Sequence, residues 1–191
     1  RQKLKNPAAG YATDFIDFIR RALPQLVEKR IRVVTNAGGL NPKACRTKIF
    51  EVARELGVSG FKVGVVEGDD LLGRLPDLLG RGHELRNMDS GAPLAPRLSQ
   101  VTSANAYIGA RPVAEALDGG ALIVLCGRVT DTALALGPLV HEFGWAWDDW
   151  DRLAAGVTVG HLMECSGQVT GGNYSGDWWN NSDPLRVGFP I

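Results

Sequence analysis

The sequence is short of cysteine, of clustered charge and of long apolar stretches, and each shortage excludes a class of protein. Its 191 residues include 3 cysteines, set far apart, which argues against a disulfide framework and favours a reducing compartment. Basic and acidic side chains number 21 each without forming blocks, so we expect no nucleic-acid partner and no membrane partner. With no membrane-spanning stretch and no signal peptide in view, we expect a cytoplasmic protein.

Several nucleotide-binding and catalytic signatures are missing as well. Neither GxGxxG nor GxxxxGK[ST] occurs, which disfavours a dinucleotide site and a P-loop. HExxH and the GxSxG elbow are also absent. We therefore expect no resident metal and no redox cofactor.

The apolar pattern predicts an α/β fold. Helical spacing or composition marks residues 13–29, 42–56, 70–79, 112–117, 131–143 and 149–165, and strand-like runs mark 31–35, 61–66 and 121–126, with a further strand expected within 100–108. A polar stretch over 83–98 reads as a long loop. Alternation of strand and helix implies parallel pairing with right-handed crossovers. We predict one domain over 1–191, three-layered and Rossmann-like without the dinucleotide fingerprint, with helices on both faces of a mostly parallel sheet.

Local signals predict how the helices begin, bend and pack. Thr13 or Asp14 is expected to cap the first helix, and Asp148 or Asp149 the last. Pro24 and Pro138 fall inside predicted helices and should kink them. Gly156 and Gly160 lie four apart, which permits a second backbone to approach the last helix closely.

Three polar segments, 35–42, 67–70 and 127–131, each follow a predicted strand and precede a predicted helix. In an open α/β sheet, ligands bind at the edge formed by the carboxyl ends of the strands. These segments are therefore the first places to look for a site.

The first segment contains Asn36, Gly38, Gly39 and Asn41 ahead of a proline-started helix. Backbone N–H groups of the glycines, with the helix dipole behind them, suit a phosphate or carboxylate. The alternative is a tight turn with an asparagine cap.

In the last segment, Arg128 offers a guanidinium that can hold a carboxylate or phosphate through two parallel hydrogen bonds. In the alternative, Arg128 pairs with Asp131, and Thr130 or Asp131 caps the following helix.

Glu67, Asp69 and Asp70 place three carboxylates at one strand end. Mutual repulsion and partial burial would suit one of them to proton transfer, or the group to a hard cation. We take Glu67 as the first acid–base candidate and Asp131 as the second. The plainer alternative is that Asp69 or Asp70 caps a helix. Asn105 either orients a substrate carbonyl or pairs with loop backbone.

His161, Glu164 and Cys165 share one face of the last predicted helix. The spacing suits a metal, but no fourth ligand can be named, so we favour a histidine satisfied within the core. Tryptophans at 145–150 and 178–179 could line an acyl site, but aromatic clusters more often form core or a subunit interface, and we expect a homo-oligomer.

Six segments carry a family resemblance: 35–42, 66–70, 104–110, 127–131, 141–145 and 160–165. In this order they resemble the N-terminal domain of the acyclic terpene utilisation (AtuA-type) family. Members of that family begin with a further glycine-rich strand and turn, and many continue into a small ferredoxin-like domain. Residue 1 is Arg and the chain ends on an apolar tail, so we expect a fragment lacking both parts.

The resemblance implies a place in the catabolism of acyclic terpenes or related branched acids, which proceeds through acyl-CoA thioesters. It carries over no catalytic residue. Our leading hypothesis is an enzyme or enzyme subunit whose substrate is a branched acyl-CoA or its free acid, with CoA present only as part of the substrate. Gly38, Gly39 and Arg128 would hold the anionic group, Asn105 a carbonyl, and Glu67 or Asp131 would move the proton. Hydration, dehydration or thioester hydrolysis would suit these groups.

Two alternatives stay open. A non-catalytic acyl-CoA-binding or scaffold module would need an exposed apolar patch, for which the tryptophans are candidates. A metal-dependent hydrolase would use Glu67, Asp69, Asp70 and Asp131 as ligands.

Overall fold

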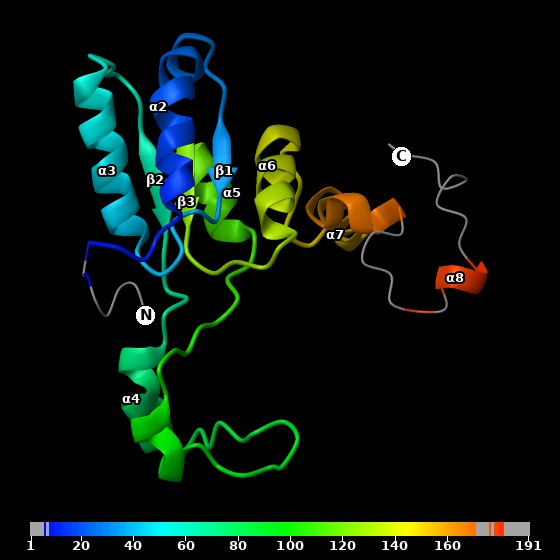
Figure 1. Cartoon of the computed structure of the whole chain (residues 1–191). Helices are drawn as coiled ribbons and strands as arrows, with labels where there is room; N and C mark the ends of the chain where they lie inside the picture. Colours follow the sequence, from blue (N-terminus) through cyan, green and yellow to red (C-terminus); the bar gives the residue numbers. More distant parts are fainter. Residues whose placement is uncertain (1–5, 7, 171–175, 177, 182–191) are drawn as a thin grey trace.

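The computed structural model has a three-stranded parallel sheet with helices on both faces (Figure 1). It describes residues 6, 8–170, 176 and 178–181. The strands are β1 (Val33–Thr35), β2 (Val63–Val66) and β3 (Ile123–Cys126), in the order β1-β3-β2. All four residues of the central strand β3 are buried. The α/β class and parallel pairing expected from the sequence are confirmed.

The strand order explains why helices cover both faces. The chain passes from β1 through α3 (Pro42–Glu55) to β2, skipping the place that β3 later fills. It then returns through α5 (Arg111–Asp118) to the centre, in the opposite direction. Because both crossovers of a parallel sheet are right-handed, reversing the direction puts the second helix on the other face. Neighbouring strands β1 and β3 then send their following loops to opposite faces, which is where α/β sheets usually bind ligands.

One face is covered by α2 (Thr13–Glu28) and α3. The fully buried side chains of these two helices are Ile19, Leu23, Cys45, Ile49 and Val52, which lie in one cluster with Ile123 and Leu125 of β3. Pro24 lies inside α2 as predicted. The predicted cap is wrong: the residue before the helix is Ala12, whose methyl group cannot accept a hydrogen bond. The Ala12 N–H donates to the carbonyl oxygen of Ala37.

The opposite face is covered by α5 and α6 (Ala133–Phe143). Gly137 lets the two helices meet, because a Cβ there would lie 2.5 Å from Cγ1 and 2.7 Å from Cβ of Val113. Pro138 follows inside the helix, as predicted.

Helix α7 (Trp150–Cys165) packs on α6 through its two glycines. A Cβ at Gly156 would lie 2.7 Å from Cδ1 of Leu136, and one at Gly160 would lie 3.1 Å from the carbonyl oxygen of Thr132. The contact at Gly160 confirms the predicted close approach of a second backbone, whereas the neighbours of Gly156 are side chains. Asp149 caps the helix by accepting from the Arg152 N–H at 3.3 Å, also as predicted.

Residues 71–103 form a lobe that extends from the carboxyl edge of the sheet (Figure 1). Its elements are the 3₁₀ helix η1 (Leu72–Arg74), α4 (Leu75–Gly80) and the 3₁₀ helix η2 (Ala95–Gln100). The long loop predicted over 83–98 is present as far as η2.

The strand expected within 100–108 is wrong. The segment 104–108 forms only isolated bridges, Asp70 with Asn105 and Ile108 with Val129. It passes across the ends of β2 and β3 and bonds to the loops beyond them, so it never aligns with a strand. After α7 come the 3₁₀ helix η3 (Ser166–Thr170) and α8 (Trp178–Asn181).

None of the helices among the described residues is long and apolar enough to cross a bilayer.

Replacing Gly137 with alanine tests the packing of α6 on α5. The new methyl would overlap Cβ of Val113, which is fully buried, so we expect the free energy of unfolding to fall by about 1–3 kcal/mol. Gly80→Ala is the matched control, because it adds the same methyl at the end of α4 where no atom lies within 4 Å. Urea unfolding measures the free energy of unfolding of both variants. Equal values would contradict the close packing of α6 on α5.

Candidate functional site

The carboxyl edge of the sheet is organised around the buried side chain of Asp69, which is 5% exposed. Its Oδ2 accepts the backbone N–H of Arg128 at 2.9 Å and Nδ2 of Asn105 at 3.0 Å. Its own carbonyl oxygen accepts the Ala106 N–H at 2.8 Å. One residue thus joins the end of β2, the crossing segment 104–108 and the end of β3. Asp69 is therefore no helix cap, although either aspartate was a candidate for that role.

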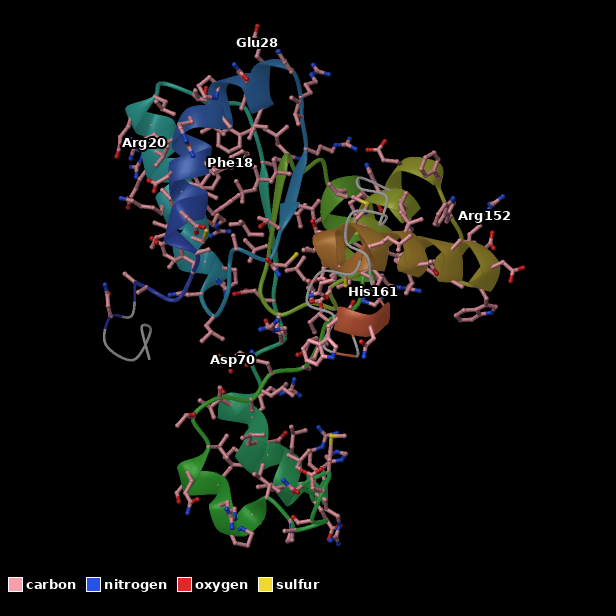
Figure 2. All side chains as sticks on the ribbon, turned by 45° about the vertical axis from the view of Figure 1, so that its right-hand side comes forward. Phe18, Arg20, Glu28, Asp70, Arg152 and His161 are labelled. Carbon is pink, nitrogen blue, oxygen red and sulfur yellow. The ribbon has the colours of Figure 1, made fainter. Side chains whose placement is uncertain are left out.

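The neighbouring Asp70 lies two residues before η1, and the N-cap position itself is Leu71, which makes no side-chain cap. Oδ1 of Asp70 accepts the Leu72 N–H at 3.1 Å at the start of η1. Two adjacent carboxylates of the same sequence motif thus have different roles, one inside the edge and one at the neck of the lobe, where Figure 2 shows Asp70.

Gly127 makes room for the buried carboxylate. A Cβ at this position would lie 2.4 Å from Oδ1 of Asp69, closer than any contact the two atoms could tolerate. The glycine that ends β3 is therefore required by the Asp69 contact, a role the sequence analysis did not identify.

Arg128 is fixed at its backbone and exposed at its side chain. Its guanidinium carbon lies 5.5 Å from the ring centroid of Tyr107, a cation–π contact that holds it at the surface. Within the described part of the chain it forms no ion pair, so the expected alternative of a pair with Asp131 is not seen. A planar cation is thus presented to solvent beside the edge of the sheet.

The caps expected after β3 are wrong. Helix α6 begins after Thr132, which makes no side-chain cap, because the preceding turn is closed by backbone bonds. The Thr130 N–H donates to Ile108, and the Ala133 N–H to Thr130. Asp131 lies exposed in this turn.

The loop after β1 lies against the loop after β3. A Cβ at Gly38 would lie 2.6 Å from the carbonyl oxygen of Cys126, so the two loops share one edge, as the strand-end argument requires. The loop's own amides are used locally: Gly39 donates to Asn36 at 3.0 Å and Asn41 to Gly38 at 2.9 Å. The Asn41 side chain caps α3 by accepting the Ala44 N–H. These bonds agree with the turn-and-cap alternative, and anion binding by these amides stays a prediction.

Glu67 lies on a cavity of about 280 Å³ between the start of α3 and the end of β2. Its carboxylate pairs with Nζ of Lys43 at 2.9 Å across that cavity. A larger hollow of about 680 Å³ opens where the chain enters the strands, around residues such as Arg32 and Lys62. We favour the smaller one, because ligands of parallel sheets bind at the carboxyl edge.

Asn105 and Arg128 thus meet through Asp69, and Glu67 lies on the adjoining cavity. Asn36 is exposed at the start of its loop. Sequence reasoning singled out Asp69 but missed its role in joining the strand ends, and it missed the role of Gly127 altogether. The signal was a carboxylate and a glycine directly beyond two strands, which local patterns cannot pair.

His161 is exposed, so the favoured interpretation as a core histidine is wrong. Leu136 and Trp145 pack against α7 at Gly156, about one and a half turns before His161, and do not cover the imidazole. The ligand atoms of His161, Glu164 and Cys165 lie within 4.8 Å of one another. Sγ of Cys165 donates to Oε2 of Glu164 at 3.2 Å; this bond, partial burial and the charges of Glu164 and Asp131 raise the pKa of that thiol.

Removing the Asp69 side chain should loosen the whole edge. Asp69→Ala leaves the N–H of Arg128 and the amide of Asn105 without their acceptor, so we expect a loss of about 2–4 kcal/mol of unfolding free energy. Asp70→Ala is the control and should cost only about 1 kcal/mol, the net value of one exposed hydrogen bond. Chemical denaturation compares them; an equal loss in both would show that burial of Asp69 is energetically unimportant.

Cysteine reactivity tests the placement of the three thiols. Burial raises the pKa of Cys45 to about 11, and burial with the Asp69 charge raises that of Cys126 to about 12, so neither forms a thiolate near neutral pH. We expect a disulfide reagent at pH 8 to modify Cys165 alone in the folded protein, and all three thiols in denaturant. Rapid modification of Cys126 in the folded protein would contradict its assignment to the core.

Comparison with known proteins shows to which family the chain belongs. No curated protein and no solved structure matches the chain significantly. The family model described as acyclic terpene utilisation family protein AtuA matches residues 1–191. Since this match covers the whole sequence, the chain belongs to the AtuA family.

Proposed function

We propose that the protein is an enzyme or enzyme subunit of acyclic terpene utilisation, acting on a branched acyl-CoA or its free acid at the carboxyl edge of its sheet. The family's description supplies the metabolic setting. The hydrogen bonds of the buried Asp69 are the observation that supports a site here. Burying a carboxylate is costly, and this one holds three chain segments together at the edge where α/β proteins bind ligands.

Arg128 is the anion-binding residue of this proposal. Its backbone is held by Asp69 and its guanidinium rests on Tyr107, so little freedom is lost when it binds a carboxylate or a CoA phosphate. The adjoining cavity contains Lys43, a second cation near the start of α3. A substrate with more than one anionic group, as an acyl-CoA has, suits such spaced cations.

Asn105 and the exposed carboxylates supply the remaining groups. Asp69 takes one amide N–H of Asn105 and so fixes the direction of that side chain toward the edge, where it would orient a carbonyl. Glu67 and Asp131 remain the two proton-transfer candidates, Glu67 with its charge held by Lys43 and Asp131 free of the predicted cap. Hydration, dehydration or thioester hydrolysis would use these groups.

The hydrolase that would use Glu67, Asp69, Asp70 and Asp131 as metal ligands is a weaker candidate. Oδ2 of Asp69 and Oδ1 of Asp70 already accept hydrogen bonds. Among the described residues, these four carboxylates are not gathered closely enough for one ion to bind three of them.

A binding or scaffold module is the second candidate, and exposed apolar side chains on α7 favour it. Trp150 is 73% exposed and Met163 is 69% exposed. A homo-oligomer, which we expect, would cover such side chains. Trp145 and Trp147, by contrast, pack against the core beside α6.

The test is ligand binding by the full chain, screened by thermal shift against branched acyl-CoAs and the matching free acids. A ligand present at a hundred times its dissociation constant stabilises the folded state by about 2.7 kcal/mol. Arg128→Ala removes a charged contact worth about 1.5–3 kcal/mol, so we expect affinity to fall about ten- to hundredfold with the fold intact.

Arg152→Ala is the matched control, because Arg152 lies on α7 far from Asp70 in Figure 2 and pairs only with its neighbour Asp149 among the described residues. Unchanged affinity in Arg128→Ala would remove its assigned role. Wild-type protein that binds none of these compounds would overturn the proposal itself. Release of free CoA or a change in acyl saturation then separates an enzyme from a carrier.

A further inference from the structure

We propose that the last turn of α7 carries a binding site for Zn²⁺ or a similar divalent transition metal, formed by His161, Glu164 and Cys165. Such a site would be independent of the acyl compound that the protein binds. The three residues occupy positions i, i+3 and i+4 of α7, which face the same way.

The three side chains are already grouped. The imidazole nitrogen, the carboxylate oxygen and the sulfur lie within 4.8 Å of one another, and Glu164 and Cys165 are in contact at 3.2 Å. Ligand atoms around a tetrahedral zinc ion lie about 3.3–3.8 Å apart, given bonds of about 2.0–2.3 Å. Small rotations of exposed side chains would therefore complete the set.

The donor chemistry selects the kind of metal. Mg²⁺ and Ca²⁺ prefer oxygen ligands alone, whereas a nitrogen, a sulfur and an oxygen together suit Zn²⁺ and its neighbours in the first transition row. Three protein ligands leave a fourth position open for water or substrate, which is the arrangement of catalytic rather than structural zinc sites.

The electrostatic setting favours a cation independently of the ligand set. The site lies at the C-terminal end of a 16-residue helix, where the macrodipole is negative, and the last turn of α7 contains no basic residue. Asp131 adds a further negative charge close enough to act on the Cys165 thiol. A bound divalent cation would neutralise both the negative end of the macrodipole and the charge of Asp131.

The surroundings would let a substrate reach the metal. A cavity of about 530 Å³ lies beside His161 and Cys165, and Val157, Leu162 and Val169 also line it. Gly160, one residue before His161, packs against Thr132 of the loop that follows β3. This contact brings the C-terminal half of α7, where Figure 2 labels His161, close to the loop that follows β3.

The test is cobalt spectroscopy on the reduced, chelator-treated full chain. Co²⁺ bound by Cys165 should give a thiolate-to-cobalt charge-transfer band that saturates at one equivalent and disappears when Zn²⁺ is added. Cys165→Ser should abolish the band, and His161→Ala should weaken Co²⁺ binding at least about tenfold, since one of three ligands is lost. Because these side chains lie on the surface or partly so, circular dichroism should show an intact fold.

His83→Ala is the matched control, because it removes another exposed imidazole, in the loop after α4. It should leave the band unchanged, as should Arg128→Ala, which separates this test from that of acyl binding. Absence of the charge-transfer band in the wild-type protein, or equal weakening by His83→Ala and His161→Ala, would overturn the proposal.

Discussion

Burial of the Asp69 carboxylate is the constraint on which the edge of the sheet depends. A carboxylate taken out of water is costly unless its oxygens accept hydrogen bonds, and here the donors come from the end of β3 and from Asn105. Satisfying it forces the segment 104–108 to cross the strand ends and leaves no room for a side chain at Gly127. The backbone N–H of Arg128 points inward to Asp69, and its side chain is exposed. The exposed guanidinium at this edge is thus positioned by the buried carboxylate.

The same residue anchors the lobe. The chain leaves the sheet after Asp69 and returns at Ala104, where the Leu71 N–H donates to Ala104 at 2.8 Å and the Ala106 N–H to Asp69 at 2.8 Å. These two backbone hydrogen bonds lie on either side of the antiparallel bridge between Asp70 and Asn105, and together they form the neck of the lobe. Any displacement of the lobe would pull on Asn105 and hence on Asp69, so the lobe and the candidate site are mechanically connected.

Features set by local sequence could be predicted, and those set by tertiary contacts could not. Apolar patterns located α2, α3 and β3 to within a few residues, and Asn41 and Asp149 were recognisable as the caps of α3 and α7. Nothing local says which of two adjacent aspartates will be buried, because that depends on Gly127 and Asn105, far along the chain. His161 was misplaced for a related reason: its helix packs through Gly156 and Gly160, so the apolar side chains beside the histidine face outward and did not mark a core.

The loop after β3 connects the two candidate sites. At one end, Asp69 holds the N–H of Arg128; at the other, Gly160 of α7 packs against Thr132. Asp131 lies between them, exposed, and its charge reaches Cys165. The hydrogen bond to Asp69 and the close contact at Gly160 hold the two ends of this loop, so packing rather than loop flexibility sets where the Arg128 backbone lies relative to α7. If Arg128 binds the anionic group of the substrate as proposed, Asp131 is held three residues further along the same loop, and a proton-transfer group on a fixed backbone is what preorganised catalysis requires.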